Sequence, residues 1–202
     1  MAKYWGYVLV PHETYLAWKN ATNGNGYDVD STYGCQCWDF ASLFWYNVGF
    51  GTGYPLLNGV NAYTMWDRRY ENISHNGVQV FDLITNINDI QQGDIMVFNA
   101  NQYNPFGHVG FADQDFATWT PSPSQPYEFP ILSENNGGYP DPAGGAYVNI
   151  HGYDYRLFLG AFRYKDWERP VPPTPTVTRK PTKHRFPWCL YARKFRNQRQ
   201  GM

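Results

Sequence analysis

The sequence predicts an α+β domain in which N-terminal helices pack on an antiparallel β-sheet. Helical spacing of apolar residues is confined to the stretch that ends at Tyr70. From Gly77 onward, short apolar or alternating runs are separated by Gly, Pro and Asn, as in strands joined by turns. A run of helices followed by a run of strands is typical of α+β domains, and a hydrophobic content of 43% supports a packed core.

The N-terminal half contains the expected helices. Pro11 favours a helix start, and Tyr15, Leu16 and Trp18 then form an apolar stripe that stops at the NGNG run of residues 23–26. The expected elements are a strand or docking segment at 4–10 and helices at 12–22, 36–46 and 61–70.

The second half contains the expected strands. The run GDIMVFN begins with a turn at Gly93 and Asp94 and is expected to form a hairpin with the strand that follows Gly107. Residues 113–129 are expected to form a long surface loop. The predicted strands are 78–82, 94–99, 107–112, 130–134, 146–150 and 156–164.

The composition changes abruptly after Trp167. We expect a domain at 1–168, a Pro/Thr-rich basic linker at 169–184 and a short basic tail at 185–202. The tail is too short for a domain. The opening of a truncated second module, a docking peptide and a shifted reading frame remain open for it.

Charge is divided unevenly along the chain. Residues 1–168 carry 7 Lys/Arg and all 17 Asp/Glu, whereas residues 169–202 carry 9 Lys/Arg and no acid. An acidic body argues against nucleic acid as the partner. The N-terminus has no signal-peptide pattern, and no apolar stretch is long enough to span a membrane.

One of the three cysteines is placed for chemistry. Cys35 and Cys37 are too close to bridge without strain, and Cys189 lies in the tail. Cys37 falls in the first helical turn after Gln36, where the helix dipole is expected to lower the pKa of the thiol. Cys37 is therefore a candidate nucleophile, with a buried structural thiol as the alternative. We expect Cys35 to be a small packed residue.

A thiol hydrolase also needs a histidine and a polar group that holds the imidazole. His108 starts an apolar strand directly after Gly107 and is expected to project into a cleft; a packed core histidine is the alternative. Glu134 and Asn136 point to the same side if their strand continues through them, and either could accept a hydrogen bond from the imidazole. Asn135 fits an ordinary turn.

These segments carry a family resemblance. Cys37-Trp38-Asp39, GDIMVFN, GHVG around His108 and SENNG around Glu134 and Asn136 occur in the order found in the CHAP family, the cysteine- and histidine-dependent amidohydrolases/peptidases. Over residues 10–165 the chain resembles that family. The resemblance implies a papain-like α+β fold and, as in many phage endolysins, cleavage of an amide bond of bacterial peptidoglycan.

The resemblance also implies roles for the residues. Cys37 is the nucleophile, His108 the general base and acid, and Glu134 the residue that orients His108, with Asn136 assisting. The backbone N–H of Cys37, together with Gln36, is implied as the oxyanion hole.

The loop before Cys37 is a candidate Ca²⁺ site. Asp28, Asp30 and Asp39 supply carboxylates, and Thr32 and Gly34 lie between them with backbone carbonyls. The spacing is not an EF-hand, but it is similar to a Ca²⁺ loop of some phage CHAP domains, which implies a structural ion. A solvated acidic loop, with Asp39 capping a local element, is the alternative. A Cys-x-Cys pair lacks the further ligands of a Zn²⁺ site.

The expected function is that of a phage endolysin, either an N-acetylmuramoyl-L-alanine amidase or a peptidoglycan endopeptidase. It would be made in the host bacterial cytoplasm and reach the wall with the help of a holin. A non-catalytic, Ca²⁺-dependent wall-binding module and a virion-associated tail hydrolase are the alternatives.

Overall fold

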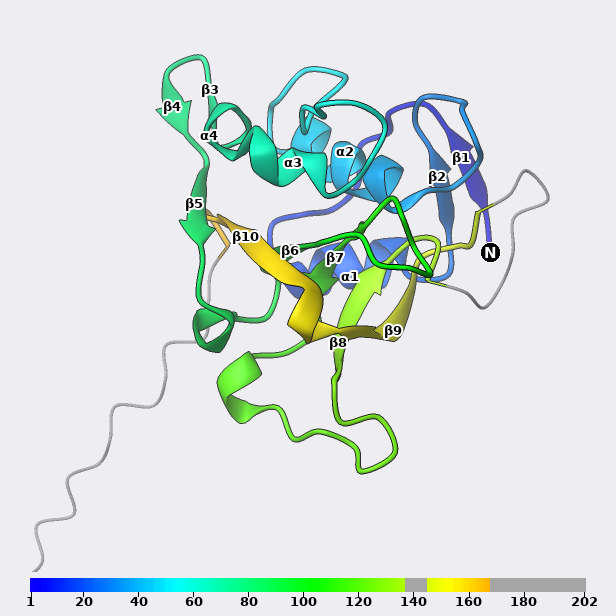
Figure 1. Ribbon diagram of the computed structural model, residues 1–202. Helices are drawn as coiled ribbons and strands as arrows, with labels where there is room; N and C mark the ends of the chain where they lie inside the picture. Colours follow the sequence, from blue (N-terminus) through cyan, green and yellow to red (C-terminus); the bar gives the residue numbers. More distant parts are fainter. Residues whose placement is uncertain (137–144, 168–202) are drawn as a thin grey trace, which may run out of the picture. The chain divides into compact units, whose positions relative to one another are not determined.

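The computed structural model describes residues 1–136 and 145–167. The predicted linker at 169–184 and tail at 185–202, with Cys189, lie outside the described residues. Within them, the architecture is a mixed α+β fold, which confirms the predicted class (Figure 1).

The centre of the fold is a six-stranded sheet with the order β5-β10-β6-β7-β8-β9, in which every neighbouring pair is antiparallel. The strands are β5 (Phe81–Ile84), β6 (Ile95–Phe98), β7 (His108–Ala112), β8 (Glu128–Ser133), β9 (Asn149–Asp154) and β10 (Phe158–Tyr164). β6 and β7 form the predicted hairpin, with Phe98 opposite His108. The hairpin therefore places His108 at the beginning of a central strand.

The helices lie in the N-terminal half, as expected. They are α1 (Tyr15–Thr22), α2 (Cys37–Asn47), α3 (Thr64–Asp67) and α4 (Arg69–Asn72). The Thr14 hydroxyl caps α1 by accepting a hydrogen bond from the Ala17 N–H. The helix predicted at 61–70 is instead two single turns, because Arg68 leaves helical geometry at φ −99° and ψ 21°.

Two small sheets complete the fold. β1 (Lys3–Trp5) pairs in parallel with β2 (Gly26–Asp28), and β3 (Ser74–His75) pairs with β4 (Val78–Gln79). The sequence predicts only a loop at β2. The three residues of β2 are buried, so this strand anchors the start of the acidic loop in the protein interior.

The sheet is covered on both faces. Between the helices and the sheet, the α2 residues Phe40 and Phe44 pack against Phe111 of β7, and Trp18 of α1 stacks on Phe40. On the opposite face, Phe98 belongs to a second core cluster. Because both faces of β6 are buried, this strand is apolar throughout rather than alternating.

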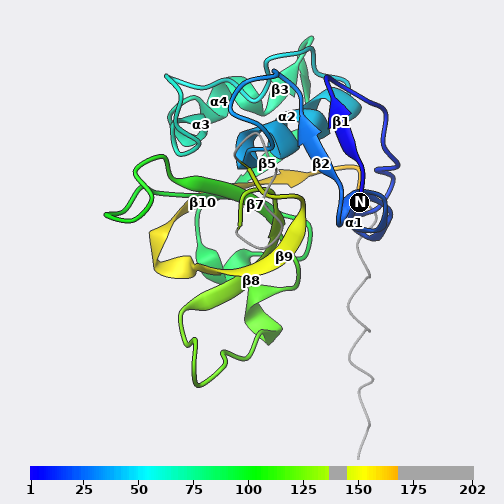
Figure 2. The ribbon, with the colours of Figure 1, turned by 90° about the vertical axis from the view of Figure 1, so that its right-hand side faces the viewer.

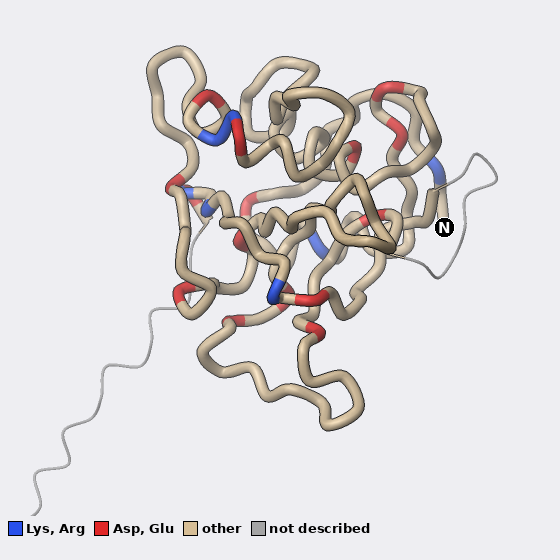
Figure 3. The backbone as a smooth tube through the Cα atoms, in the orientation of Figure 1, with Lys and Arg blue, Asp and Glu red and all other residues tan. Residues whose placement is uncertain are grey.

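Figures 1 and 2 show α2, α3 and α4 on one side of the sheet and the loop between β7 and β8 extending from the other. That loop carries a single 3-10 turn at Phe116–Thr118 and agrees with the predicted surface loop. Acidic residues are spread along the described chain, and Lys and Arg are sparser (Figure 3). No helix in the described part of the chain is long and apolar enough to cross a membrane.

Candidate active site

Cys37 and His108 line the same cleft, which has a volume of about 400 Å³. Cys37 comes from the first turn of α2, and His108 from the first position of β7. Aromatic and aliphatic side chains form much of the wall. The other lining residues are Tyr33, Gln36, Trp38, Val60, Ala62, Asn104, Phe106, Gly107 and Asn135.

The Cys37 thiol is held against the sheet. Its sulfur is hydrogen-bonded to the backbone of Val109, the residue after His108, and to the backbone of Trp38. These contacts lower the pKa of the thiol, but burial outweighs them and raises it to about 12. The expectation of a lowered thiol pKa is therefore wrong for the described state, because desolvation outweighs the backbone hydrogen bonds that favour the thiolate.

Asn136 orients the imidazole of His108. The distance from His108 Nε2 to Asn136 Oδ1 is 2.6 Å, and Asn136 Nδ2 donates to the carbonyls of Ser133 and Asn149. Those two donations fix the amide so that its oxygen faces the ring. An amide oxygen only accepts, so Nε2 carries the proton and Nδ1 is the basic nitrogen.

The imidazole is also enclosed. The ring of Tyr153 stacks on His108 with centroids 4.6 Å apart and planes 19° from parallel. Burial lowers the pKa of His108 to about 4, with a further lowering from His151 and an opposing effect of the Asn136 hydrogen bond. Near pH 7 the thiol of Cys37 and the imidazole of His108, which line the same cleft, are thus both neutral.

Glu134 lies elsewhere. Its Oε1 accepts a hydrogen bond of 2.5 Å from the backbone N–H of Tyr27 in β2, and its side chain is completely buried. The expectation that Glu134 orients His108 with Asn136 assisting is corrected by this geometry, because Asn136 makes the contact to the ring. Glu134 instead ties the end of β8 to β2, where the acidic loop starts.

Gln36 lines the cleft but is heavily engaged. Its backbone N–H donates to Asp39 Oδ2, its Nε2 donates to the Tyr33 carbonyl, and its Oε1 accepts from Asn135 Nδ2. Any oxyanion contact from Gln36 must therefore come from its side-chain amide. Asn135 adopts φ 58°, a turn conformation that Asn tolerates, as expected.

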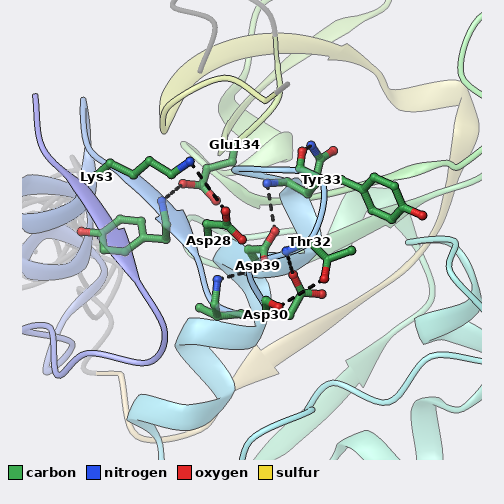
Figure 4. A network of polar contacts seen from close by, with 10 residues as sticks. Lys3, Asp28, Asp30, Thr32, Tyr33, Asp39 and Glu134 are labelled. Atoms are coloured by element: carbon green, nitrogen blue, oxygen red, sulfur yellow. Dashed lines mark hydrogen bonds and ion pairs between the residues drawn. The ribbon is translucent and has the colours of Figure 1, made fainter. Parts of the chain in front are cut away.

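The predicted metal ligands Asp28, Asp30 and Asp39 do come together. One carboxylate oxygen of each lies within 4.8 Å of the others. Burial, followed by the charge of Asp30, raises the pKa of Asp39 to about 8. Figure 4 shows the three carboxylates gathered at the loop, with Lys3 approaching Asp28 from β1. The Lys3 Nζ to Asp28 Oδ2 distance is 3.6 Å.

This carboxylate cluster fits a cation such as Ca²⁺. Asp28 Oδ1 is buried without a hydrogen-bond partner, and such an atom is costly unless something positive covers it. Asp39 also has a structural task, because its oxygens accept from the N–H groups of Val29 and Gln36 at the start of α2. The capping alternative and the metal alternative are thus compatible.

The two other predicted ligands are less engaged with the cluster. The Thr32 hydroxyl and N–H donate to the carbonyl and Oδ1 of Asp30, which folds the loop onto itself. Gly34 is buried with φ 75°, a value suited to glycine. Their carbonyls stay candidate ligands only.

Comparison with known proteins identifies the family. The CHAP domain model matches residues 17–118, about half of the chain. The chain belongs to the CHAP family.

A relative and a solved structure agree with that membership. The chain is 30% identical over 166 residues to a D-alanyl-L-alanine endopeptidase of Streptococcus phage B30, in an alignment that covers 78% of this chain and 32% of the relative. The chain thus spans about a third of that relative's length. The crystal structure of the wild-type endolysin LysIME-EF1 matches with a TM-score of 0.55 at 21% identity, covering 80% of this chain and 66% of that one, which supports the same fold.

Sequence reasoning missed two residues that shape this CHAP site. Tyr153 falls beyond the strand predicted at 146–150, whereas β9 continues to Asp154 and brings the ring over His108. Gly145 packs so closely on the loop before Cys37 that a Cβ there would overlap the Cys35 carbonyl. A tyrosine among 17 and a glycine among 19 give no sequence signal of such contacts.

Proposed function

We propose that the chain is a peptidoglycan hydrolase of the phage endolysin type, and that it cleaves an amide bond through Cys37. The observation that carries the proposal is the joint placement of Cys37, His108 and Asn136. The thiol and the imidazole line one cleft, and the Asn136 amide fixes the proton on Nε2. CHAP membership supports the reaction class.

His108 acts first as a base. Its Nδ1 takes the proton of the Cys37 thiol while the sulfur attacks the amide carbonyl carbon, so that charge develops only as the bond forms. The imidazolium then gives the proton to the departing nitrogen as the C–N bond breaks. A thioester remains. His108 takes a proton from the water that attacks the thioester carbon, and returns it to the Cys37 sulfur as the C–S bond breaks, which releases the acid product.

Asn136 and Tyr153 hold the ring during these transfers. Asn136 Oδ1 accepts from Nε2 throughout and stabilises the imidazolium, and the stacked Tyr153 ring limits rotation. The oxyanion is assigned to the backbone N–H of Cys37, with the Gln36 side chain as the second donor. We assign no catalytic contact to Glu134.

A Ca²⁺ ion at Asp28, Asp30 and Asp39 is part of the proposal, with carbonyls of Thr32 and Gly34 as further candidate ligands. The buried Asp28 Oδ1 and the raised pKa of Asp39 support it, because both are relieved by a divalent cation. The ion would supply only structural charge balance for the loop that leads to Cys37.

Among the bonds of peptidoglycan, the proposal favours a peptide bond over the amidase bond. The support is the phage B30 relative, which is an endopeptidase, and the apolar wall of the cleft, which suits small aliphatic side chains. Synthesis in the host cytoplasm and release with a holin fit an endolysin and remain predictions.

Mass spectrometry of purified cell walls after digestion tests the proposal. We expect new free amino termini on peptide fragments and no peptide-free muramic acid. Release of peptide-free muramic acid would make the enzyme an amidase. Walls bound but chemically unchanged would favour the wall-binding alternative.

A further inference from the structure

A second cavity, of about 280 Å³, lies beside His108. It shares Asn104, His108 and Asn135 with the cleft that holds Cys37. The loop before β7 and the strands β8 and β9 form the rest of its wall. A substrate that passes His108 from the first cleft thus meets this second cavity.

The chemistry decides which part of a substrate lies there. The acyl carbon must lie at Cys37, and the departing nitrogen must come within hydrogen-bond reach of His108. The scissile bond therefore spans the step from Cys37 to His108. The part of the substrate beyond that nitrogen, the amine half, continues toward the cavity on the far side of the imidazole. This inference rests on the proposed function.

The wall of the second cavity is polar and carries a net negative charge. Asp154 is neutralised by Arg156, with a distance of 2.6 Å between Oδ2 and Nη2. Glu128 is half-buried, and its carboxylate accepts a hydrogen bond from Gln125. In the described part of the chain, no Lys or Arg forms an ion pair with Glu128.

Two rings complete the cavity. Tyr103 is 87% exposed, so its face is available for contact, and Tyr153 presents the ring that stacks on His108. The imidazole of His151 is also part of the wall. An unneutralised carboxylate beside the exposed Tyr103 ring suits a cation, since both attract positive charge.

We propose that this cavity is the subsite for the amine half of the substrate, and that Glu128 selects peptides whose amine half carries a primary ammonium group. Glu128 is thus a specificity-determining residue, and it takes no part in bond cleavage. The proposal applies to an endopeptidase and to an amidase alike, because the departing nitrogen belongs to a peptide in both.

Binding measurements test the subsite without catalysis. The Cys37→Ala protein is titrated with two peptides that represent the amine half and differ only in a lysine side chain, which is free in one and acetylated in the other. We expect about fivefold tighter binding of the free lysine at low salt, with a smaller ratio at high salt.

Two variants made in the Cys37→Ala protein assign the preference. Glu128→Gln should bring the affinity ratio close to one. Glu13→Gln, which removes an exposed carboxylate that lines neither cavity, should keep the original ratio. An equal affinity for the two peptides, or a preference that survives Glu128→Gln, would overturn the proposal.

Cleavage assays separate this inference from the proposed function. The substrates for these assays contain the scissile bond, and their amine halves carry either the free or the acetylated lysine. If the wild-type enzyme cuts both substrates with equal kcat/KM, the subsite is wrong and the hydrolase stands. If it cuts neither of these substrates nor cell walls while the binding preference follows Glu128, the hydrolase is wrong and the cavity is a binding site.

Discussion

The two sides of the cleft are built differently. The side that carries Cys37 is a loop and a helix start, with Ser31, Tyr33 and Gly34 at positive φ and three carboxylates crowded together. The side that carries His108 consists of paired strands, and the hydrogen bonds that hold His108 through Asn136 are between neutral groups. The proposed nucleophile thus depends on a loop with an excess of negative charge, whereas the proposed base is held by the sheet.

This difference predicts which change in solution conditions affects each side of the cleft. Backbone hydrogen bonds and stacked rings hold the histidine side and are insensitive to ions. On the cysteine side, like charges destabilise the loop unless Lys3 or a bound cation compensates them. Changes in ion concentration should therefore act on the cysteine side, and acidification below pH 6.5 should act on the histidine side through His108.

The largest expected effect on the histidine side comes from Asn136. Asn136→Ala removes the acceptor for His108 Nε2, so the ring loses its orientation and its tautomer. We expect kcat to fall by about 10- to 100-fold with little change in KM, as measured on soluble peptide substrates.

Glu134→Gln is the matched comparison. It weakens the buried hydrogen bond to the Tyr27 N–H, and we expect a loss of about 1–3 kcal/mol in the free energy of unfolding with kcat within a few-fold of wild type. A loss of kcat for Glu134→Gln as large as that for Asn136→Ala would return the orienting role to Glu134.

Removal of metal should act on the cysteine side. EDTA is expected to lower the melting temperature by a few degrees and to reduce activity, and added Ca²⁺ should restore both. The physical reason is that the ion compensates the carboxylates of the loop before Cys37. Differential scanning fluorimetry against Ca²⁺ concentration measures the effect.

Two aspartate variants test whether the effect of Ca²⁺ arises at the carboxylate cluster. Asp30→Asn should abolish the response to Ca²⁺, whereas Asp67→Asn, at an exposed position outside the cluster, should leave it intact. If wild-type protein melts at the same temperature in EDTA and in Ca²⁺, the metal proposal is rejected.

A smaller effect is expected from pH. His108 must be neutral to act as a base, and its pKa of about 4 lies below the ordinary value of 6.5. The acid limb of kcat/KM should therefore fall near pH 4 to 5. Asn136, His151 and Tyr153 face the ring, and none of them supplies a compensating negative charge near neutral pH.

The free energy of unfolding should also depend on pH because of the lowered pKa of His108. Between pH 6.5 and pH 4 the unfolded chain binds a proton at His108 that the folded chain does not, so the contribution of His108 to stability is full above pH 6.5 and is lost as the pH falls toward 4. Urea unfolding at pH 7.5 and pH 5 should show about 2 kcal/mol less of this decline in His108→Gln than in wild type. An acid limb near pH 6.5 would contradict the burial of the imidazole.

Much of this architecture was predictable from the sequence, because local patterns fix it. The hairpin around GDIMVFN and His108 follows from a turn at Gly93 and an apolar run, and the helix from Gln36 follows from its apolar face and its cap. Local structure positions both Cys37 and His108. The two residues therefore line one cleft, as the sequence predicts.

The predictions that proved wrong concern properties that tertiary contacts determine, namely which side chain contacts His108 and the pKa of Cys37. Glu134 and Asn136 are close in sequence, and no local pattern tells which one reaches the ring and which one turns to Tyr27. The pKa of Cys37 depends on burial by the surrounding chain, which raises it and is not visible in the local sequence.

The most direct measurement compares two neighbouring cysteines. Purified cell walls are digested with wild type, Cys37→Ala and Cys35→Ala, and the new amino termini are quantified by mass spectrometry. Cys35 is equally free of disulfides and is buried in the loop, but it does not line the cleft. The account predicts at least a thousandfold loss for Cys37→Ala with an unchanged fold by circular dichroism, and retained cleavage for Cys35→Ala. Undiminished cleavage by folded Cys37→Ala would contradict it.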